Sequence, residues 1–321
     1  MGQIYNFSAG PAVLPEPVLA AASEAVREYN GYGMSILEMS HRSKPIVAMV
    51  EETRQLVRDL LNVPENYKIL FLQGGASLQF SMIPMNILKE GETADYTDTG
   101  AWSAKAIKEA QRFGNVNVIS SSKETVYDHI PKNLVQTDDQ VYLHITSNNT
   151  IYGTQWHEFP RVNGFLAGDM SSDIFSRPID VSQFGVIYAG AQKNMGPAGV
   201  TMVIIREDLM GRSEREIPTM LDFAIHADKD SMFNTPPVFA IYVVNRTLHW
   251  LQELGGVEAM LELNKTKAQL LYDEIERNPM FKSPIADEDR SLMNVPFVFA
   301  DGGDEKNFLN YCGERGLVTL K

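Results

Sequence analysis

The chain has 321 residues, of which 44% are hydrophobic, and it carries a formal net charge of −13 at pH 7. The acidic residues are spread along the chain and no basic stripe occurs, so nucleic acid is not expected as a partner. No apolar run is long enough to span a bilayer, so no membrane partner is expected either.

The single cysteine, Cys312, excludes an intrachain disulfide and is typical of a protein in a reducing compartment. The N-terminus lacks the basic and apolar regions of a signal peptide. Both observations predict a cytoplasmic protein.

The N-terminal part of the chain is predicted to form two helices joined by polar turns. Residues 1–14 are expected to be irregular. Pro15 and Pro17 suit the first turn of a helix that runs to about residue 29, because the N–H groups there have no intrahelical partner. A polar cluster at 39–43 precedes a second helix, predicted over 46–61 from apolar side chains at helical spacing.

Short apolar runs then alternate with helical patterns. The predicted strands cover residues 69–72, 93–97, 116–120, 141–146, 164–167, 186–189 and 200–205, and helices are predicted over 78–88 and 103–113. Regular alternation implies crossover helices and a mostly parallel sheet. Ligands bind such sheets at the carboxyl ends of the strands.

The pattern changes after about residue 240. Helices, strands and turns are predicted here at 239–254, 257–277, 292–299, 306–313 and 316–320. They indicate a smaller α+β domain that looks unfinished at the last residue. We therefore predict a large domain at 15–250, and a small domain made of 1–14 and 251–321 whose C-terminal part is missing.

One Gly-rich loop, residues 188–199, carries a single lysine, Lys193, between two apolar strands. A lysine in such a place is costly to desolvate unless it is paired or used. It is either a solvated loop lysine or a lysine that forms a Schiff base.

Other strand ends offer polar or aromatic groups. Residues 74–77 follow a strand and open a helix, whose N-terminus suits a phosphate. Asp169 follows an apolar strand, and Trp102 stands just before a helix. Each feature alone has an ordinary explanation as a turn, a cap or a packing residue. Together a lysine, a carboxylate, an aromatic ring and a phosphate site are what pyridoxal phosphate requires of a protein.

Five segments carry a resemblance to a known family: residues 7–12, 40–42, 169–172, 176–179 and 188–194. The last of them, Tyr-Ala-Gly-Ala-Gln-Lys-Asn, is very specific. On these motifs the chain resembles the phosphoserine aminotransferase family of the fold-type I, class V aminotransferases. The resemblance implies an α/β fold with a mostly parallel seven-stranded sheet flanked by helices, plus a smaller α+β domain.

The resemblance also implies how pyridoxal 5′-phosphate would be held. Lys193 would bind it covalently and move the proton during transfer, while Asp169 would pair with the pyridine nitrogen. Trp102 would stack on the ring, and Thr150 would hydrogen-bond the phenolic oxygen. No metal ligands are expected.

The phosphate would be bound by Ala76, Ser77 and Gln192. Asn234 and Thr235 match residues that reach this phosphate from a neighbouring subunit, so the resemblance implies a homodimer with shared active sites.

His41 and Arg42 match the pair that binds an anionic group of the substrate. Where some family members have a second serine, this chain has Ala9. The family normally continues past Lys321 with a Gly-His-Arg segment whose arginine binds the substrate α-carboxylate. The sequence therefore predicts a chain that lacks part of its substrate site.

The implied reaction exchanges an amino group between L-glutamate and 3-phosphohydroxypyruvate, giving O-phospho-L-serine and 2-oxoglutarate. The related 4-phosphohydroxythreonine of pyridoxine biosynthesis is an equally anionic substrate that the site could accept. Other class V chemistry remains open, as in a serine–pyruvate transaminase or a cysteine desulfurase. A clipped form with impaired substrate binding, or a silent cofactor-binding protein, is the third alternative.

Overall fold

Seven strands form the central sheet in the order β2-β10-β9-β8-β5-β3-β4. The computed structural model describes residues 3–320. The strands are β2 (Tyr67–Leu72), β3 (Thr93–Asp98), β4 (Asn115–Ser121), β5 (Tyr142–Thr146), β8 (Phe165–Asp169), β9 (Phe184–Gly190) and β10 (Thr201–Arg206). Only β10 runs antiparallel to its neighbours, so the predicted mostly parallel, seven-stranded sheet is confirmed.

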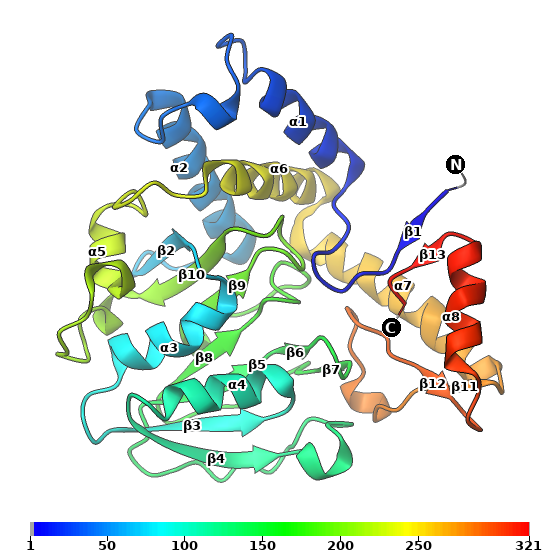
Figure 1. Cartoon of the computed structure of the whole chain (residues 1–321). Coiled ribbons are helices and arrows are strands. Elements are labelled where there is room, and N and C mark those ends of the chain that lie inside the picture. Colours follow the sequence, from blue (N-terminus) through cyan, green and yellow to red (C-terminus); the bar gives the residue numbers. More distant parts are fainter. Residues whose placement is uncertain (1–2, 321) are drawn as a thin grey trace.

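Helices cover both faces of this sheet (Figure 1). The α-helices are α1 (Glu16–Arg27), α2 (Lys44–Leu61), α3 (Gly75–Ile87), α4 (Ala101–Ala110), α5 (Phe223–Asp228), α6 (Val238–Leu254), α7 (Gly256–Arg277) and α8 (Glu305–Glu314). Helices α1, α2 and α6 share one apolar core with the sheet, and α3, α4 and α5 share the other. Strands β8 and β9 are buried along their whole length, as expected where both faces are covered.

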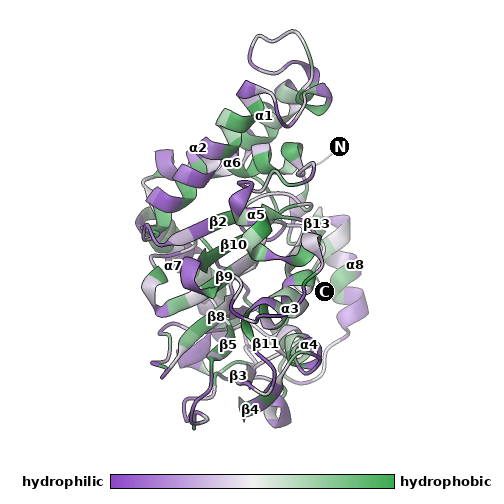
Figure 2. Cartoon of the chain, turned by 90° about the vertical axis from the view of Figure 1, so that its left-hand side faces the viewer, coloured by the Kyte–Doolittle hydropathy of each residue, from purple (hydrophilic) through white to green (hydrophobic). Residues whose placement is uncertain are grey.

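Hydropathy follows this layering. Figure 2 shows hydrophobic residues along β9 and β10 and hydrophilic residues on α2. In α2 the buried side chains recur at helical spacing, which is the pattern that predicted this helix. Among the described residues, no helix combines the length and the apolar character needed to cross a membrane.

Short elements complete the chain. Three further strand pairs are β1 (Tyr5–Asn6) with β13 (Leu317–Val318), β6 (Asn148–Asn149) with β7 (Thr154–Gln155), and β11 (Phe281–Lys282) with β12 (Val298–Phe299). The 3-10 turns are η1 (Ile36–Glu38), η2 (Lys123–Thr125), η3 (Val181–Gln183), η4 (Glu207–Leu209), η5 (Thr219–Leu221) and η6 (Asp287–Asp289).

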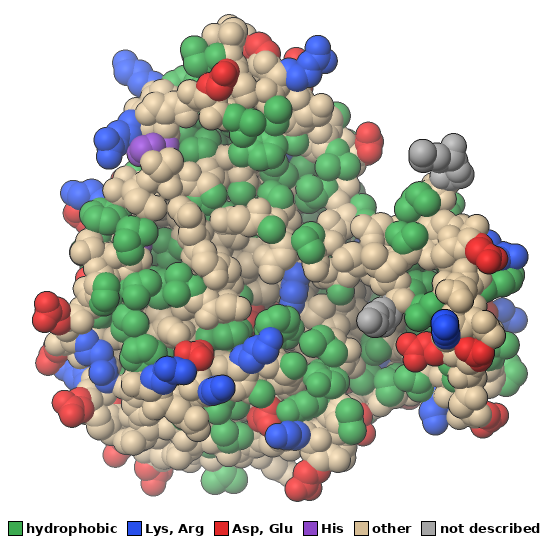
Figure 3. All heavy atoms as spheres, viewed as in Figure 1, with side chains coloured by type: hydrophobic (Ala, Val, Ile, Leu, Met, Phe, Trp, Pro, Cys, Tyr) green, Lys and Arg blue, Asp and Glu red, His purple; other side chains and the backbone are tan. Residues whose placement is uncertain are grey.

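The N-terminal segment contains a strand that the sequence did not predict. Strand β1 pairs in parallel with β13, so both ends of the described chain lie beside α8 (Figure 1). The surface is hollowed between this part and the body of the molecule (Figure 3). The division into domains at 15–250 and at 1–14 with 251–321 stays a prediction.

The predicted strand over 292–299 is wrong except for its last two residues, which form β12. Pro296 cannot donate a ladder hydrogen bond. Leu292 instead donates its N–H to the side chain of Gln155 at 3.0 Å, and the Asn294 side chain accepts from Asn148 at 2.8 Å. This segment is therefore fixed by side chains of the β6–β7 hairpin rather than by a second strand.

Candidate active site

Lys193 lies in the turn that joins β9 to β10, at the carboxyl end of β9. Its Nζ donates to Thr150 Oγ1 at 2.6 Å and lies 5.2 Å from the centroid of the Trp102 ring. A Cβ at Gly10 would come within 2.8 Å of the Lys193 side chain, so a larger residue there would push this side chain aside. Three predicted site residues, Lys193, Thr150 and Trp102, thus lie together.

Asp169 is the last residue of β8, one position inside the strand rather than beyond it as predicted. Its side chain is 5% exposed. The Oδ1 atom accepts from the backbone N–H of Ser171 at 3.0 Å and from its hydroxyl at 2.6 Å. The Ser171 hydroxyl oxygen in turn accepts from the Gly190 N–H at 3.1 Å, which ties the carboxylate to the end of β9.

Burial shifts the pKa of Lys193 and that of Asp169 in opposite directions. Desolvation lowers the pKa of Lys193 below its ordinary value, although the charges of Asp169 and Asp173 oppose this shift. Desolvation raises the pKa of Asp169, against the hydrogen bonds from Ser171 and the charge of Lys193. Lys193 therefore loses its proton more easily than a lysine in water, as a base or nucleophile must.

The substitution Asp169→Asn is expected to stabilise the cofactor-free chain at pH 7, by roughly 1–3 kcal/mol, because it removes a desolvated charge and keeps the oxygen that Ser171 binds. The pKa of Asp169 is higher in the folded chain than in the unfolded one, so the ionised carboxyl destabilises the fold above about pH 4. The gain should vanish as the pH falls below that value. Urea unfolding between pH 4 and 7 measures it.

Asp95→Asn is the matched control. This carboxyl is also fully buried, but its two oxygens accept from the N–H and the hydroxyl of Thr137 at 2.8 and 2.6 Å. An amide group can accept at only one of these positions, so this change should destabilise the chain. Loss of stability in Asp169→Asn at pH 7 would contradict the prediction.

Helix α3 begins with two glycines in left-handed conformations. Gly74 has φ of 92° and Gly75 has φ of 67°, which other residues adopt only with strain. The turn leaves the first N–H groups of the helix, at Ala76 and Ser77, without intrahelical partners. These groups and the positive end of the helix dipole suit an anion at this edge of the sheet.

Gln192 and the segment at 234–235 make different contacts. The backbone oxygen of Gln192 accepts from the Ala12 N–H at 2.9 Å. The backbone oxygen of Thr235 accepts from the Gln73 side chain at 3.1 Å and from the Asn234 side chain at 3.4 Å. Asn234 and Thr235 therefore lie beside the α3 N-terminus of their own chain.

A cavity of about 280 Å³ adjoins this segment. Its lining is mainly apolar and comprises Phe71, Leu72, Gln73, Gly74, Leu78, Met82, Met220, Leu221, His226, Asn234 and Pro236. It includes Gly74 and Asn234 and leaves out Lys193 and Asp169, so it borders the predicted phosphate site.

His41 and Arg42 lie elsewhere, in the turn between η1 and α2. The Arg42 backbone N–H donates to the Ser40 hydroxyl at 3.2 Å, and Arg42 is exposed. The buried His41 Nε2 has no hydrogen-bond partner within residues 3–320. No hydrogen bond or ion pair in that range joins either residue to Lys193 or Asp169.

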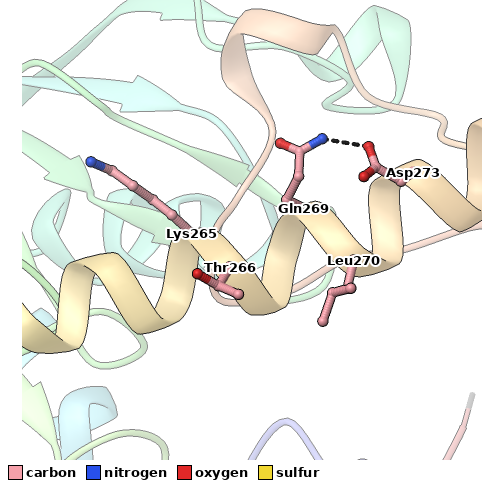
Figure 4. Close-up of a pocket in the computed structure, with 5 residues that line it drawn as sticks. All are labelled: Lys265, Thr266, Gln269, Leu270 and Asp273. Carbon is pink, nitrogen blue, oxygen red and sulfur yellow. Dashed lines mark hydrogen bonds between the residues drawn. The ribbon is translucent and has the colours of Figure 1, made fainter.

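Another hollow, of about 410 Å³, lies on the outer side of α7 (Figure 4). Its lining residues are Lys265, Thr266, Gln269, Leu270 and Asp273. None of them is a predicted site residue, and Gln269 donates to Asp273 within the same helix. This hollow is separate from the Lys193 cluster.

Sequence reasoning gave no role to Ser171 or Gly10, although both lie within motifs that it singled out. The signal for Ser171 was its position two residues after an aspartate, where a serine commonly closes a side-chain turn. Gly10 carried no comparable local signal, because its contact with Lys193 joins distant parts of the chain.

The sequence matches a known protein family. The family model "Aminotransferase class-V" matches residues 4–318. A phosphoserine aminotransferase of Parabacteroides distasonis is 51% identical over 99% of this chain and 89% of its own length. One of Geobacillus kaustophilus is 52% identical over 100% of this chain and 90% of its own length.

Solved structures of the same family are similar to this fold. The phosphoserine aminotransferase from Bacillus circulans subsp. alkalophilus superposes with a TM-score of 0.96 at 47% identity, over 99% of this chain and 90% of that one. A phosphoserine aminotransferase from Trichomonas vaginalis, described as bound to pyridoxal phosphate, has a TM-score of 0.93 at 40% identity, over 99% of this chain and 92% of that one. The chain therefore belongs to the class V family of pyridoxal-phosphate-dependent aminotransferases, and within it to the phosphoserine aminotransferases.

Proposed function

We propose that the chain transfers an amino group between L-glutamate and 3-phosphohydroxypyruvate, giving O-phospho-L-serine and 2-oxoglutarate in serine biosynthesis. The main support is that about half of all residues, over nearly the whole chain, are identical to those of phosphoserine aminotransferases. A lysine with a lowered pKa and a buried carboxylate beside it supply the matching chemistry.

Pyridoxal 5′-phosphate is the proposed cofactor, and the residues present fit it. The fit rests on a half-buried lysine, a buried carboxylate and an aromatic ring that lie together at one edge of the sheet. Lys193 would hold the cofactor covalently and Asp169 would pair with its ring nitrogen. When bound, the cofactor supplies an electron sink for the negative charge that develops on the substrate.

The other proposed contacts are with the ring, the phenolic oxygen and the phosphate of the cofactor. Trp102 would stack on the ring, and Thr150, which now accepts from Lys193, would bind its phenolic oxygen. The phosphate would take the N–H groups at the start of α3, with Gln192 beside them. The proposed phosphate ligands from this chain are therefore Ala76, Ser77 and Gln192.

During transfer, Lys193 would move the proton at its own Nζ. This requires the neutral amine, which the lowered pKa of Lys193 makes accessible closer to neutral pH than for a lysine in water. The half-buried position of Lys193 limits the access of water to its Nζ.

The experiment that tests the function compares oxo acids in the glutamate reaction. We expect kcat/KM for 3-phosphohydroxypyruvate to exceed that for pyruvate by about a hundredfold or more, because an unfilled anion site leaves buried donors unpaired. A preference for pyruvate or glyoxylate would favour a serine–pyruvate transaminase. Cofactor binding without transfer to any oxo acid would favour a silent binding protein. Assay with 4-phosphohydroxythreonine tests the proposed second role in pyridoxine biosynthesis.

A homodimer with shared active sites is proposed as the working form. In it, Asn234 and Thr235 would reach the cofactor phosphate of the partner subunit. His41 and Arg42 would bind the anionic group of the substrate. Support comes from the His41 Nε2, which is buried and has no hydrogen-bond partner within residues 3–320, and from Arg42, which is exposed.

Subunit mixing tests the sharing of the Arg42 site. We expect Lys193→Ala and Arg42→Ala to be nearly inactive alone. If Arg42 acts across the dimer, refolding both variants together at equal amounts restores about a quarter of the wild-type activity, because half of the dimers are mixed and each mixed dimer holds one intact site. Mixtures that stay as inactive as the single variants would show that Arg42 serves its own subunit.

We also infer that the enzyme works in the cytoplasm. The support is compositional: one cysteine, Cys312, which is buried and unpaired. Fractionation of cells that express the chain would test the inference, and recovery from an oxidising compartment would contradict it.

A further inference from the structure

A row of polar aromatic residues lies on the same face of the sheet as Asp169. In the strand register, Tyr188 on β9 stands opposite Asp169, His144 on β5 stands opposite Ala167, and Tyr96 on β3 stands opposite His144. Alternate residues of a strand share a face, so Ala167 and Asp169 point the same way. The row therefore extends from the carboxylate into the core beneath α3 and α4.

These side chains contact one another in sequence. The His144 Nε2 and the Tyr188 hydroxyl are 2.8 Å apart. The His144 ring stacks on Tyr96 with centroids 4.7 Å apart and an interplanar angle of 17°. The Tyr96 hydroxyl meets that of Tyr142 at 2.8 Å. All four residues are at most 2% exposed, so they form no part of a solvated surface.

The surroundings of His144 indicate which of its two ring nitrogens carries the proton. His144 is neutral, because burial lowers its pKa to about 3. Its Nδ1 is buried and has no partner within residues 3–320. A buried N–H without an acceptor is rarer in proteins than a buried acceptor without a donor. The proton therefore belongs on Nε2, which donates to the Tyr188 oxygen.

With the proton on His144 Nε2, the Tyr188 oxygen accepts this hydrogen bond. The hydroxyl proton of Tyr188 can then be donated to a different acceptor. Asp169 is the cross-strand neighbour of Tyr188 on this face; burial raises the pKa of Asp169, and the Tyr188 hydroxyl opposes part of this rise. Ser171 already occupies Oδ1 with two hydrogen bonds. Tyr188 and Asp169 are neighbours on adjacent strands, so the second carboxylate oxygen of Asp169 is open to a donor from Tyr188.

We propose that Tyr188 is a positioning residue for Asp169, its hydroxyl directed toward the carboxylate by the N–H of His144. This rests on the proposed function, in which Asp169 pairs with the ring nitrogen of the cofactor. Burial favours the neutral carboxyl, which cannot hold that nitrogen protonated. A donor on the core side opposes this effect and keeps the carboxylate charged and fixed in direction.

The test compares Tyr188→Phe with Tyr142→Phe. Both remove one buried hydroxyl from the same face of the sheet, but only Tyr188 is the cross-strand neighbour of Asp169. The readout is the ¹⁵N chemical shift of ¹⁵N-labelled pyridoxal phosphate bound to each protein, which reports whether the ring nitrogen is protonated. We expect Tyr188→Phe to shift this signal toward the unprotonated position, and Tyr142→Phe to leave it at the wild-type position.

Kinetics supply a second readout. Tyr188→Phe should slow the single-turnover reaction with glutamate about ten- to a hundredfold, the range for losing a hydrogen bond to a charged group, with little change in the glutamate concentration at half-saturation. His144→Leu should behave like Tyr188→Phe. His144→Gln keeps an N–H donor and should restore much of the wild-type signal.

Equal ¹⁵N shifts in Tyr188→Phe and Tyr142→Phe would overturn the inference. If Tyr188→Phe does not fold, the same shift in His144→Leu and His144→Gln would overturn it instead. Failure of the proposed function looks different: the wild-type chain would then bind the cofactor with a protonated ring nitrogen and transfer no amino group.

Discussion

Lys193→Ala is expected to lower the rate of amino-group transfer by about four orders of magnitude or more, because the same side chain is proposed to hold the cofactor and to move the proton. Single-turnover absorbance with glutamate measures the rate. In the wild-type protein, borohydride reduction and peptide mapping should place the pyridoxyl label on Lys193. Label on a different lysine would remove the basis for the proposal.

Lys267→Ala is the matched control. Lys267 lies on α7, outside the cluster, and burial lowers its pKa as it does that of Lys193. A lowered pKa alone would make the two lysines equivalent, whereas the proposal depends on the neighbours of Lys193. We therefore expect Lys267→Ala to keep wild-type activity and labelling.

Asp169→Asn is expected to leave a folded protein that binds the cofactor and is nearly inactive, with kcat lowered about a hundred- to a thousandfold. An asparagine cannot hold the ring nitrogen protonated, and loss of one preorganised electrostatic interaction typically costs about 3–4 kcal/mol in the transition state. Glutamate turnover of the purified variant, corrected for bound cofactor, measures the effect. Turnover near the wild-type rate would refute the role.

Two controls separate chemistry from folding. The same Asp169→Asn substitution should raise the stability of the cofactor-free chain, so a loss of activity could not be attributed to unfolding. Asp95→Asn should do the reverse and lower stability while the folded fraction keeps its activity. A buried carboxylate that destabilises its own chain is typical of a residue retained for function.

The fold was largely predictable because its signals are local. Apolar runs gave the strands of the central sheet, and helical spacing gave α2 over nearly its observed length. The loop that carries Lys193 also followed from sequence, since two apolar strands and several glycines define it. Its neighbours Asp169 and Trp102 could be singled out as groups at a strand end and a helix start, although each is ordinary alone. Thr150 received a role only through the family resemblance.

Features that depend on distant contacts escaped prediction. The β1–β13 pair involves two residues on each side, too few for a strand pattern. The segment at 292–297 looks like a strand but is held by hydrogen bonds to the β6–β7 hairpin. The stack of Tyr188, His144 and Tyr96 comes from three strands, and only their register brings it together.

The pairing of β1 with β13 has a consequence for the order of folding. Strand β1 is among the first parts of the chain to be synthesised, and β13 is among the last of those described. Between β1 and α1, Gly10 packs on Lys193 and the Ala12 N–H binds Gln192. The central sheet can assemble while the ribosome is still translating the later helices, but β1 gains its strand partner only when residues 317–318 emerge. The N-terminal support of the lysine turn is therefore completed late in synthesis, and a nascent chain should acquire its sheet before it acquires tight cofactor binding.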